Sequence, residues 1–347
     1  MKIALLVPFE ETVPPEKYGG TELVASNLCE TLIDYGHQVY LLATGDSKTR
    51  AKLIPIFPQA LRKEKDAFDL NFRNALKYVG IGRVFDELLK LDIDIIHNHI
   101  GWRFIPFSHH FQAPTVTTLH GPLDVPYQQL VYGSFPNAPC VSISNAQREP
   151  FPKLNYVDTV YNGIDLSQFD FEDKPGNYLA FLGRMSPEKG PRQAIEIAKK
   201  AKMKLKMAAK IDAVDVEYFK KEIEPFIDGQ QIEYLGEVGP KEKNSLLKNA
   251  YALLAPIQWR EPFGLFLAES MACGTPVVVT DMGSAREIIA DGKTGFVVQN
   301  NIDEFVNAIK KIQQIKRKEC YNRVKELFSK EKMTENYLKV YEKILKK

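Results

Sequence analysis

Short apolar runs separated by longer amphipathic stretches are the feature of this chain that most limits its fold. In the first half, the runs KIALLVPF, QVYLLAT, DIDIIHNH, TVTTLHG and CVSISN occupy residues 2–9, 38–44, 92–99, 115–121 and 140–145. Continuous apolar runs are typical of parallel strands, because the helices that connect such strands cover both faces of the sheet. The pattern predicts an α/β fold with a doubly wound parallel sheet over residues 1–165.

A second series of the same kind follows at residues 178–183, 204–209, 231–238, 251–257 and 275–280. It predicts a second Rossmann-like domain over residues 166–330, joined to the first through the polar segment 165–177. The 347 residues also exceed the roughly 100 to 200 that one ordinary core needs. We expect the two parallel-sheet domains to face each other across a cleft, with ligands at the carboxyl ends of the strands. A last helix, 331–347, can cap either domain, and a return to the N-terminal domain is one option.

Charge and cysteine content limit the partners and the compartment. The chain has 46 basic and 44 acidic residues, and a formal charge of +2 favours no nucleic acid or other polyanion. The apolar run of MKIALLVPFEE is far shorter than the roughly 20 residues of a membrane span and lacks a cleavage site. Four widely spaced cysteines suit free thiols. We expect a cytoplasmic protein with at most peripheral contact with the inner face of the membrane.

The stretch EPFGLFLAE, residues 261–269, combines a turn with two glutamates. The apolar pattern after Gly264 predicts a helix, and the free N–H groups at its start can bind an anion such as phosphate. Glu269 then lies roughly 7 Å along the helix axis. Carboxylates repel phosphate but accept hydrogen bonds from hydroxyls, so Glu261 and Glu269 suit a ligand with hydroxyl-bearing rings on both sides of its phosphates. A nucleotide sugar has this layout.

The loop in FLGRMSPEKG, residues 181–190, supplies cations after another predicted strand. Arg184 can hold phosphate oxygens bidentately, and Lys189 adds a point charge. The two together can neutralise a diphosphate as it leaves. The alternative is that both are solvated loop charges.

Gly19 and Gly20, in YGGTE, precede a helix expected to start near Thr21. Glycines at such a place let the backbone approach a ligand closely, although many such pairs only form turns. The pair is not the GxGxxG dinucleotide fingerprint, which occurs nowhere in the chain, and this counts against a nicotinamide oxidoreductase.

The motifs YGGTE, LHG, VYNGID, GRMSPEKG, EPFGLFLAE, CGTPVVVT and DGKTGFVV follow one another from residue 18 to residue 298. In this order they resemble glycosyltransferase family 4 over nearly the whole chain. The resemblance implies the GT-B fold, a nucleoside diphosphate sugar as donor, retention of anomeric configuration by a front-face mechanism, and no required metal or other cofactor.

The resemblance also implies roles for individual residues at the donor. Arg184 and Lys189 match the pair that binds the diphosphate, and Gly19 and Gly20 match the glycine loop near it. Glu269 matches the carboxylate that holds the ribose hydroxyls.

The transferred sugar is expected to contact Glu261 and His120, the histidine of the LHG turn. Glu261 is expected to orient the sugar, not to act as a nucleophile. Backbone groups near the sugar, the phosphates and the base are those of Phe263, Gly264, Leu265, Glu237 and Val238. Four residues depart from the family pattern. Lys210 and Asp212 have no assigned role, and Trp259 and Arg260 are candidates for shaping acceptor or donor selectivity.

Several alternatives stay open. UDP is the favoured nucleotide, with GDP and ADP as options, and the acceptor hydroxyl can belong to a glycan, a lipid or a small metabolite. Other functions compatible with parts of the pattern are a nucleotide-sugar epimerase or a phosphorylase of the same fold, a glycoside hydrolase, and a non-catalytic nucleotide-sugar binding protein. His97 and His99 share one strand face as metal ligands would, but without an evident third ligand we favour hydrogen-bonded histidines at the cleft edge.

Overall fold

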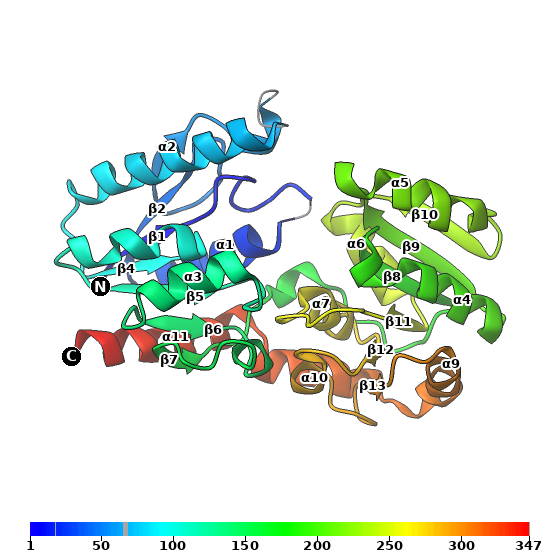
Figure 1. The fold of residues 1–347 in the computed structure, drawn as a ribbon. Helices are drawn as coiled ribbons and strands as arrows, with labels where there is room; N and C mark the ends of the chain where they lie inside the picture. The colour runs from blue at the N-terminus through cyan, green and yellow to red at the C-terminus, as the bar shows by residue number, and fades with distance from the viewer. Residues whose placement is uncertain (18, 65–68, 347) are drawn as a thin grey trace. The chain divides into compact units, whose positions relative to one another are not determined.

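The computed structural model describes residues 1–17, 19–64 and 69–346, and the chain forms two compact units (Figure 1). Unit 1 contains Met1–Gly163 and Lys330–Lys347, and unit 2 contains Ile164–Ser329. Each unit has one parallel sheet with helices packed against it, so the predicted α/β class with two Rossmann-like domains is confirmed. The segment 165–177 lies in unit 2.

The sheet of unit 1 has seven strands in the order β3-β2-β1-β4-β5-β6-β7, and all neighbours are parallel. Their bounds are β1 Lys2–Leu6, β2 Gln38–Thr44, β3 Lys52–Phe57, β4 Ile95–Asn98, β5 Thr115–Leu119, β6 Cys140–Ser142 and β7 Tyr156–Thr159. The two edge strands, β3 and β7, were not among the predicted runs. Edge strands are partly exposed and do not read as continuous apolar runs, and β3 contains Pro55, which only an edge strand readily accepts.

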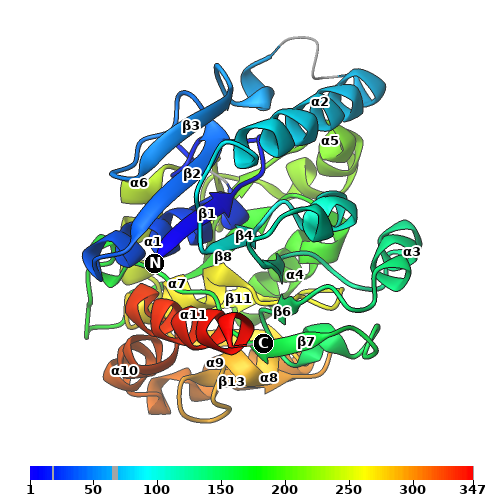
Figure 2. The ribbon, with the colours of Figure 1, turned by 90° about the vertical axis from the view of Figure 1, so that its left-hand side faces the viewer.

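Helices cover both faces of this sheet. The main helices are α1 Gly20–Asp34, α2 Leu70–Leu88, α3 Pro126–Ser134 and α11 Lys330–Leu345. Ile81 and Val84 of α2 share one core with Leu6 of β1. Tyr337 and Tyr341 of α11 contact the residues of β4 and β5 that point to the other face. Figure 2 shows α11, in red, packed beside α1.

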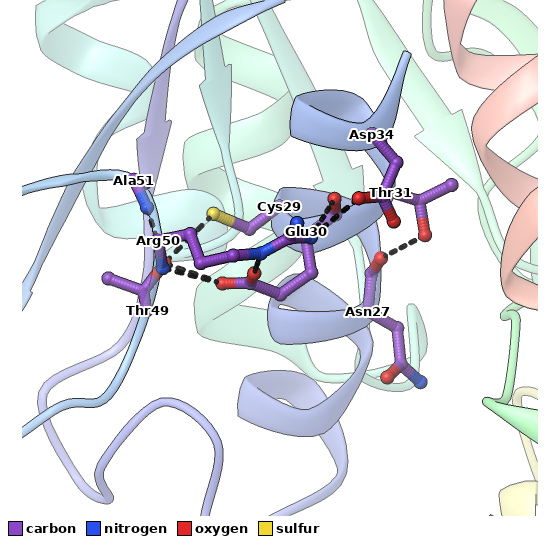
Figure 3. A network of polar contacts seen from close by, with 8 residues as sticks. All are labelled: Asn27, Cys29, Glu30, Thr31, Asp34, Thr49, Arg50 and Ala51. Atoms are coloured by element: carbon purple, nitrogen blue, oxygen red, sulfur yellow. Dashed lines mark hydrogen bonds and ion pairs between the residues drawn. The ribbon is translucent and has the colours of Figure 1, made fainter. Parts of the chain in front are cut away.

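A polar network ties α1 to the chain before β3 (Figure 3). The guanidinium of Arg50 donates to the Glu30 carboxylate at 2.6 Å and lies 2.8 Å from the Asp34 carboxylate. The Thr49 hydroxyl donates to Glu30 at 2.7 Å. These contacts position the start of β3, an element whose own sequence carries little strand signal.

The sheet of unit 2 has six strands in the order β10-β9-β8-β11-β12-β13, again all parallel. Their bounds are β8 Tyr178–Arg184, β9 Lys204–Lys210, β10 Ile232–Gly236, β11 Ala252–Ala255, β12 Val277–Thr280 and β13 Gly295–Val298. β13, a four-residue edge strand, was not predicted. The main helices are α4 Pro191–Ala201, α6 Pro240–Lys248, α7 Leu265–Ala272, α9 Ile302–Lys311 and α10 Arg317–Leu327.

Each sheet has a switch point at which the chain reverses its direction of progress across the sheet. In unit 1 this point lies between β1 and β4, and in unit 2 it lies between β8 and β11. Because crossovers are right-handed, the helices that follow the two neighbouring strands cover opposite faces, and a crevice opens at the carboxyl ends of the strands. Arg184 ends β8, and the EPFG turn follows β11.

A search for membrane-crossing segments over the described residues identifies no helix that is both long and apolar enough.

Candidate active site

The segment after β8 folds tightly against the segment after β11. Ser186 precedes a short 3-10 turn, Pro187–Lys189, and Gly190 follows with a φ of 71°. A Cβ atom at Gly190 would lie 2.0 Å from the carbonyl oxygen of Pro256. The amide of Gln258 donates to the carbonyl of Glu188 at 2.7 Å. The glycine is therefore required for the close approach of the two loops.

Lys189 forms an ion pair with Glu261 across these loops. Both residues are 8% exposed. The ammonium also lies 4.9 Å from the ring centroid of Trp259 and 5.4 Å from that of Phe266. The indole N–H of Trp259 donates to Glu261 Oε2 at 3.1 Å. Lys189 and Glu261, predicted from separate motifs, are thus in direct contact, and Trp259 belongs to the same cluster.

The backbone of the EPFG turn is held by the loop after β12. The amide of Ser284 donates to the Glu261 carbonyl at 3.0 Å, and the Ser284 hydroxyl donates to the Phe263 carbonyl at 2.8 Å. Gly283, with a φ of 58°, has no room for a side chain, since a Cβ atom would lie 2.4 Å from the Glu261 carbonyl oxygen. These contacts fix the backbone of the turn that carries Glu261.

Arg184 lies in a neighbouring charge cluster. Its guanidinium is 2.6 Å from the Glu188 carboxylate and 3.6 Å from that of Asp212. Lys210 is 3.1 Å from the same Asp212. Lys210 and Asp212, which depart from the family pattern, therefore lie beside a predicted site residue. Sequence reasoning gave no signal for this pairing.

Helix α7 begins directly after the turn. Gly264 is its N-cap, with a φ of 80°, while Phe263 is buried and Leu265 is half-buried. The first N–H groups of an eight-residue helix point toward the crevice end of the sheet. The positive end of the helix dipole adds to the charge of Lys189 and favours an anion.

Glu269, one turn into α7, is buried and pairs with Lys243 of α6, whose ammonium lies 2.5 Å away. Lys243 was not among the predicted residues, because no local pattern distinguishes it from other helix lysines. The half-buried Val238 lies just before α6, after β10. Unit 2 therefore presents two buried carboxylates, each held by a lysine, on the helix and turn that follow β11.

The predicted residues of unit 1 follow β1 and β5. Gly19 is the N-cap of α1, Gly20 is the first residue of that helix, and a Cβ atom at Gly19 would lie 2.7 Å from the Cβ of Pro15. Tyr18, which opens the YGGTE motif, lies outside the described residues. Glu22, of the same motif, is buried in the first turn of α1.

His120, after β5, contacts His99, after β4, with 2.8 Å between Nε2 and Nδ1. Burial lowers the pKa of His120 to about 4 and also lowers the pKa of His99, so both rings are neutral at neutral pH. His97 contacts the hydroxyls of Tyr341 and Thr118, each at 2.7 Å. Within the described ranges, no three acidic, histidine or cysteine side chains are arranged to hold a metal ion. His97 and His99 are buried hydrogen-bonded residues.

Two family models match consecutive parts of the chain. The model for glycosyltransferase family 4 matches residues 18–168, and the model for glycosyl transferases group 1 matches residues 165–327. Together the two matches include every strand of the two sheets except β1. The fold and the matches together define the class: a GT-B glycosyltransferase. The chain belongs to the family 4 type of these enzymes.

Individual relatives agree with this assignment. A phosphatidyl-myo-inositol mannosyltransferase of Mycolicibacterium smegmatis is 25% identical, over 86% of this chain and 81% of that protein. AviGT4, a glycosyltransferase involved in avilamycin A biosynthesis, superposes with a TM-score of 0.78 at 25% identity, over 99% of this chain and 98% of that one. Anabaena HepE, solved in complex with UDP and glucose, has a TM-score of 0.76 at 19% identity, over 99% and 100% of the two chains.

Proposed function

We propose that this glycosyltransferase moves a sugar from a nucleoside diphosphate sugar to an acceptor hydroxyl, with retention of anomeric configuration and UDP as the favoured nucleotide. The observation that carries the proposal is the convergence of Lys189, Glu261 and the N-terminus of α7 at the ends of the neighbouring strands β8 and β11. The complexes of HepE with UDP and with UDP-glucose support a uridine nucleotide.

In this proposal the cations serve the leaving group. Arg184, Lys189 and the free amides at the start of α7 stabilise the negative charge that develops on the diphosphate, a contribution of several kcal/mol at comparable enzyme sites. Glu269 accepts hydrogen bonds from the ribose, and Glu261 accepts them from the transferred sugar. Backbone groups near Val238 contact the base, and the glycines Gly19 and Gly20 let the backbone approach the donor.

The reaction needs no protein nucleophile. The bond between the anomeric carbon and the diphosphate oxygen breaks, and the acceptor oxygen bonds to the same face of the sugar. The acceptor proton goes to an oxygen of the leaving phosphate. His120, which burial keeps neutral, contacts the sugar as a hydrogen-bonding group and not as a cation. The acceptor is a hydroxyl of a glycan, a lipid or a small metabolite.

The test is a binding and turnover screen of UDP, GDP, ADP and their sugar conjugates. We expect thermal stabilisation by one nucleotide series and slow hydrolysis or transfer of its sugar. Arg184→Ala and Lys189→Ala should each weaken binding about tenfold or more, because hydrogen bonds to charged groups contribute about 1.5 to 3 kcal/mol.

Lys200→Ala is the matched control, since Lys200 belongs to the same unit but forms an exposed ion pair with Asp303. It should bind the nucleotide as the wild type does. An unaltered thermal transition with every nucleotide at millimolar concentration would reject the proposal.

A further inference from the structure

Glu261 holds the ammonium that the proposed function assigns to the diphosphate. The carboxylate of Glu261 pairs with Lys189, although 72 residues separate them in the chain. Both side chains are almost fully buried, so neither charge has bulk water as an alternative partner. A diphosphate that binds Lys189 would therefore compete with the Glu261 carboxylate for the ammonium.

A displaced Glu261 carboxylate needs new partners. Unpaired buried charges are costly, so a ligand that only displaces Glu261 binds more weakly than its contacts with Lys189 suggest. Hydroxyls of the transferred sugar can donate hydrogen bonds to the carboxylate. In the proposed orientation, the ribose hydroxyls of a nucleoside diphosphate go to Glu269, and its phosphates carry no hydroxyl for Glu261.

Trp259 offers a partner that does not depend on the ligand. Its indole N–H already donates to Glu261 Oε2 at 3.1 Å, and an indole N–H cannot serve as an acceptor for Lys189. The ring of Trp259 lies 4.9 Å from the Lys189 ammonium, so one side chain touches both members of the pair. The backbone of Glu261 is held separately by Ser284.

We propose that Glu261 and the donor diphosphate alternate on Lys189, and that Trp259 is the positioning residue that holds Glu261 after the exchange. The inference rests on the proposed function and adds a specificity device to the same site. The sugar hydroxyls of a sugar nucleotide donate hydrogen bonds to the displaced Glu261 carboxylate. The nucleoside diphosphate product does not, so Glu261 returns to Lys189 and favours release of the product.

The first experiment compares Glu261→Gln with the wild type by calorimetry, using UDP, inorganic pyrophosphate and the sugar nucleotide that the enzyme turns over. We expect UDP and pyrophosphate to bind Glu261→Gln about tenfold more tightly, because the competing charge on Lys189 is gone. Binding of the sugar nucleotide should not tighten in parallel, and turnover should fall. The preference for sugar nucleotide over UDP should therefore shrink.

The second experiment isolates Trp259. Trp259→Phe keeps a ring beside Lys189 but removes the indole N–H, and it should weaken UDP binding about three- to tenfold. In the Glu261→Gln background the same change should have almost no effect, because the carboxylate it serves is absent. A purely structural role for Trp259 would give equal losses in both backgrounds.

The chain has two tryptophans and 15 tyrosines, so Trp102→Phe leaves Trp259 as the only tryptophan, whose emission can be excited selectively. Trp102 lies in unit 1, and this variant should keep wild-type binding of UDP. We expect UDP to change the Trp259 emission when Glu261 leaves Lys189, and to change it less in the Glu261→Gln background. If Glu261→Gln folds poorly, Glu261→Asp withdraws the carboxylate from Lys189 and should also tighten UDP binding.

The outcomes separate the two proposals. Turnover of a sugar nucleotide by the wild type, with no tighter binding of UDP or pyrophosphate to either Glu261 variant, would overturn the exchange and leave the proposed function intact. Tighter pyrophosphate binding to Glu261→Gln, without turnover of any sugar nucleotide, would support the exchange and reject the proposed donor. If pyrophosphate does not bind Glu261→Gln more tightly and no sugar nucleotide is turned over, the exchange and the proposed function are both overturned.

Discussion

At the scale of single residues, burial acts in opposite directions on the acids and imidazoles of unit 1. It raises the pKa of Glu22 to about 7, with the nearby charges of Glu11 and Glu10 adding to the effect, and it lowers the pKa of His97 to about 3. The charged form is disfavoured in both cases, because it loses its hydration. At neutral pH the buried histidines carry no charge, and Glu22 is close to its titration midpoint.

The raised pKa of Glu22 predicts a pH-dependent stability. Between the unfolded pKa, near 4.5, and the folded pKa, near 7, the folded state binds more protons, so the free energy of unfolding falls as pH rises. The fall is of the order of 3 kcal/mol at 1.36 kcal/mol per pKa unit. We expect Glu22→Gln to remove this part of the change in urea unfolding between about pH 5 and about pH 8.

Glu16→Gln is the control, because Glu16 has 73% of its side chain exposed in the same unit. It should keep the wild-type pH dependence. If the free energy of unfolding changes equally with pH in the wild type and in Glu22→Gln, Glu22 ionises normally in the folded state. The free energy of unfolding of Glu22→Gln is subtracted from that of the wild type at each pH. This difference also removes the contribution of the buried histidines, which makes the free energy of unfolding rise with pH and so opposes that of Glu22.

At the scale of elements, the site depends on loops that approach one another more closely than side chains allow. Gly190 lies against the carbonyl of Pro256, and Gly283 lies against the backbone of Glu261. Both have positive φ values, which favour glycine. The loops after β8, β11 and β12 therefore pack tightly against one another around Lys189 and Glu261. Backbone contacts between these loops set the positions of the two paired side chains.

Gly283→Ala should disturb the site more than its backbone strain alone explains. The positive φ costs an alanine roughly 1 to 2 kcal/mol. The new Cβ would also lie 2.4 Å from the Glu261 carbonyl oxygen and 2.6 Å from its nitrogen, so the turn must move. We expect a lower melting temperature together with a loss of nucleotide binding and turnover, measured by thermal shift and by donor hydrolysis.

Gly292→Ala is the matched control. Gly292 has a φ of 71°, but a Cβ atom there meets nothing within 4 Å. Gly292→Ala should lose only the stability that a positive φ costs an alanine, and it should bind the nucleotide as the wild type does. Equal losses in the two variants would mean that the contact with Glu261 is not required.

At the scale of the whole molecule, the two ends of the chain build the same unit. Helix α11, from the end of the chain, packs beside α1 (Figure 2). Its tyrosines contact polar side chains of β4 and β5. Tyr337 and Tyr341 are fully buried, and their hydroxyls contact Thr118 and His97. Unit 1 therefore needs the last residues of the chain, whereas unit 2 is one continuous segment.

Tyr337→Ala should destabilise unit 1 and spare unit 2. Truncation of a fully buried aromatic side chain costs about 3 to 5 kcal/mol, and the hydroxyl of Thr118 loses a partner. Amide hydrogen exchange should speed up over Met1–Gly163 and α11, with little change over Ile164–Ser329. Tyr127→Ala, at a tyrosine 59% exposed in the same unit, should leave exchange unchanged. A uniform increase over both units would show that they unfold as one.

Local patterns were sufficient to predict much of this molecule. Buried strands, turn glycines and helix starts are encoded in consecutive residues, because each reflects a burial face or a backbone conformation of that segment. The α/β class, ten of the strands and the order of the family motifs follow from the sequence for this reason. The edge strands β3 and β7 were not predicted because partial exposure interrupts the apolar run, whereas β13 was not predicted although its four residues, GFVV, are all apolar.

The tertiary structure decided which side chains meet. Lys189 with Glu261, Lys243 with Glu269, and His99 with His120 all join segments that are distant in sequence. No local pattern encodes such pairs, because they depend on the strand order and the register of neighbouring strands. The sequence by itself determined that this protein has the fold and motifs of a family 4 glycosyltransferase, and only the tertiary structure set a carboxylate on the lysine proposed for the diphosphate.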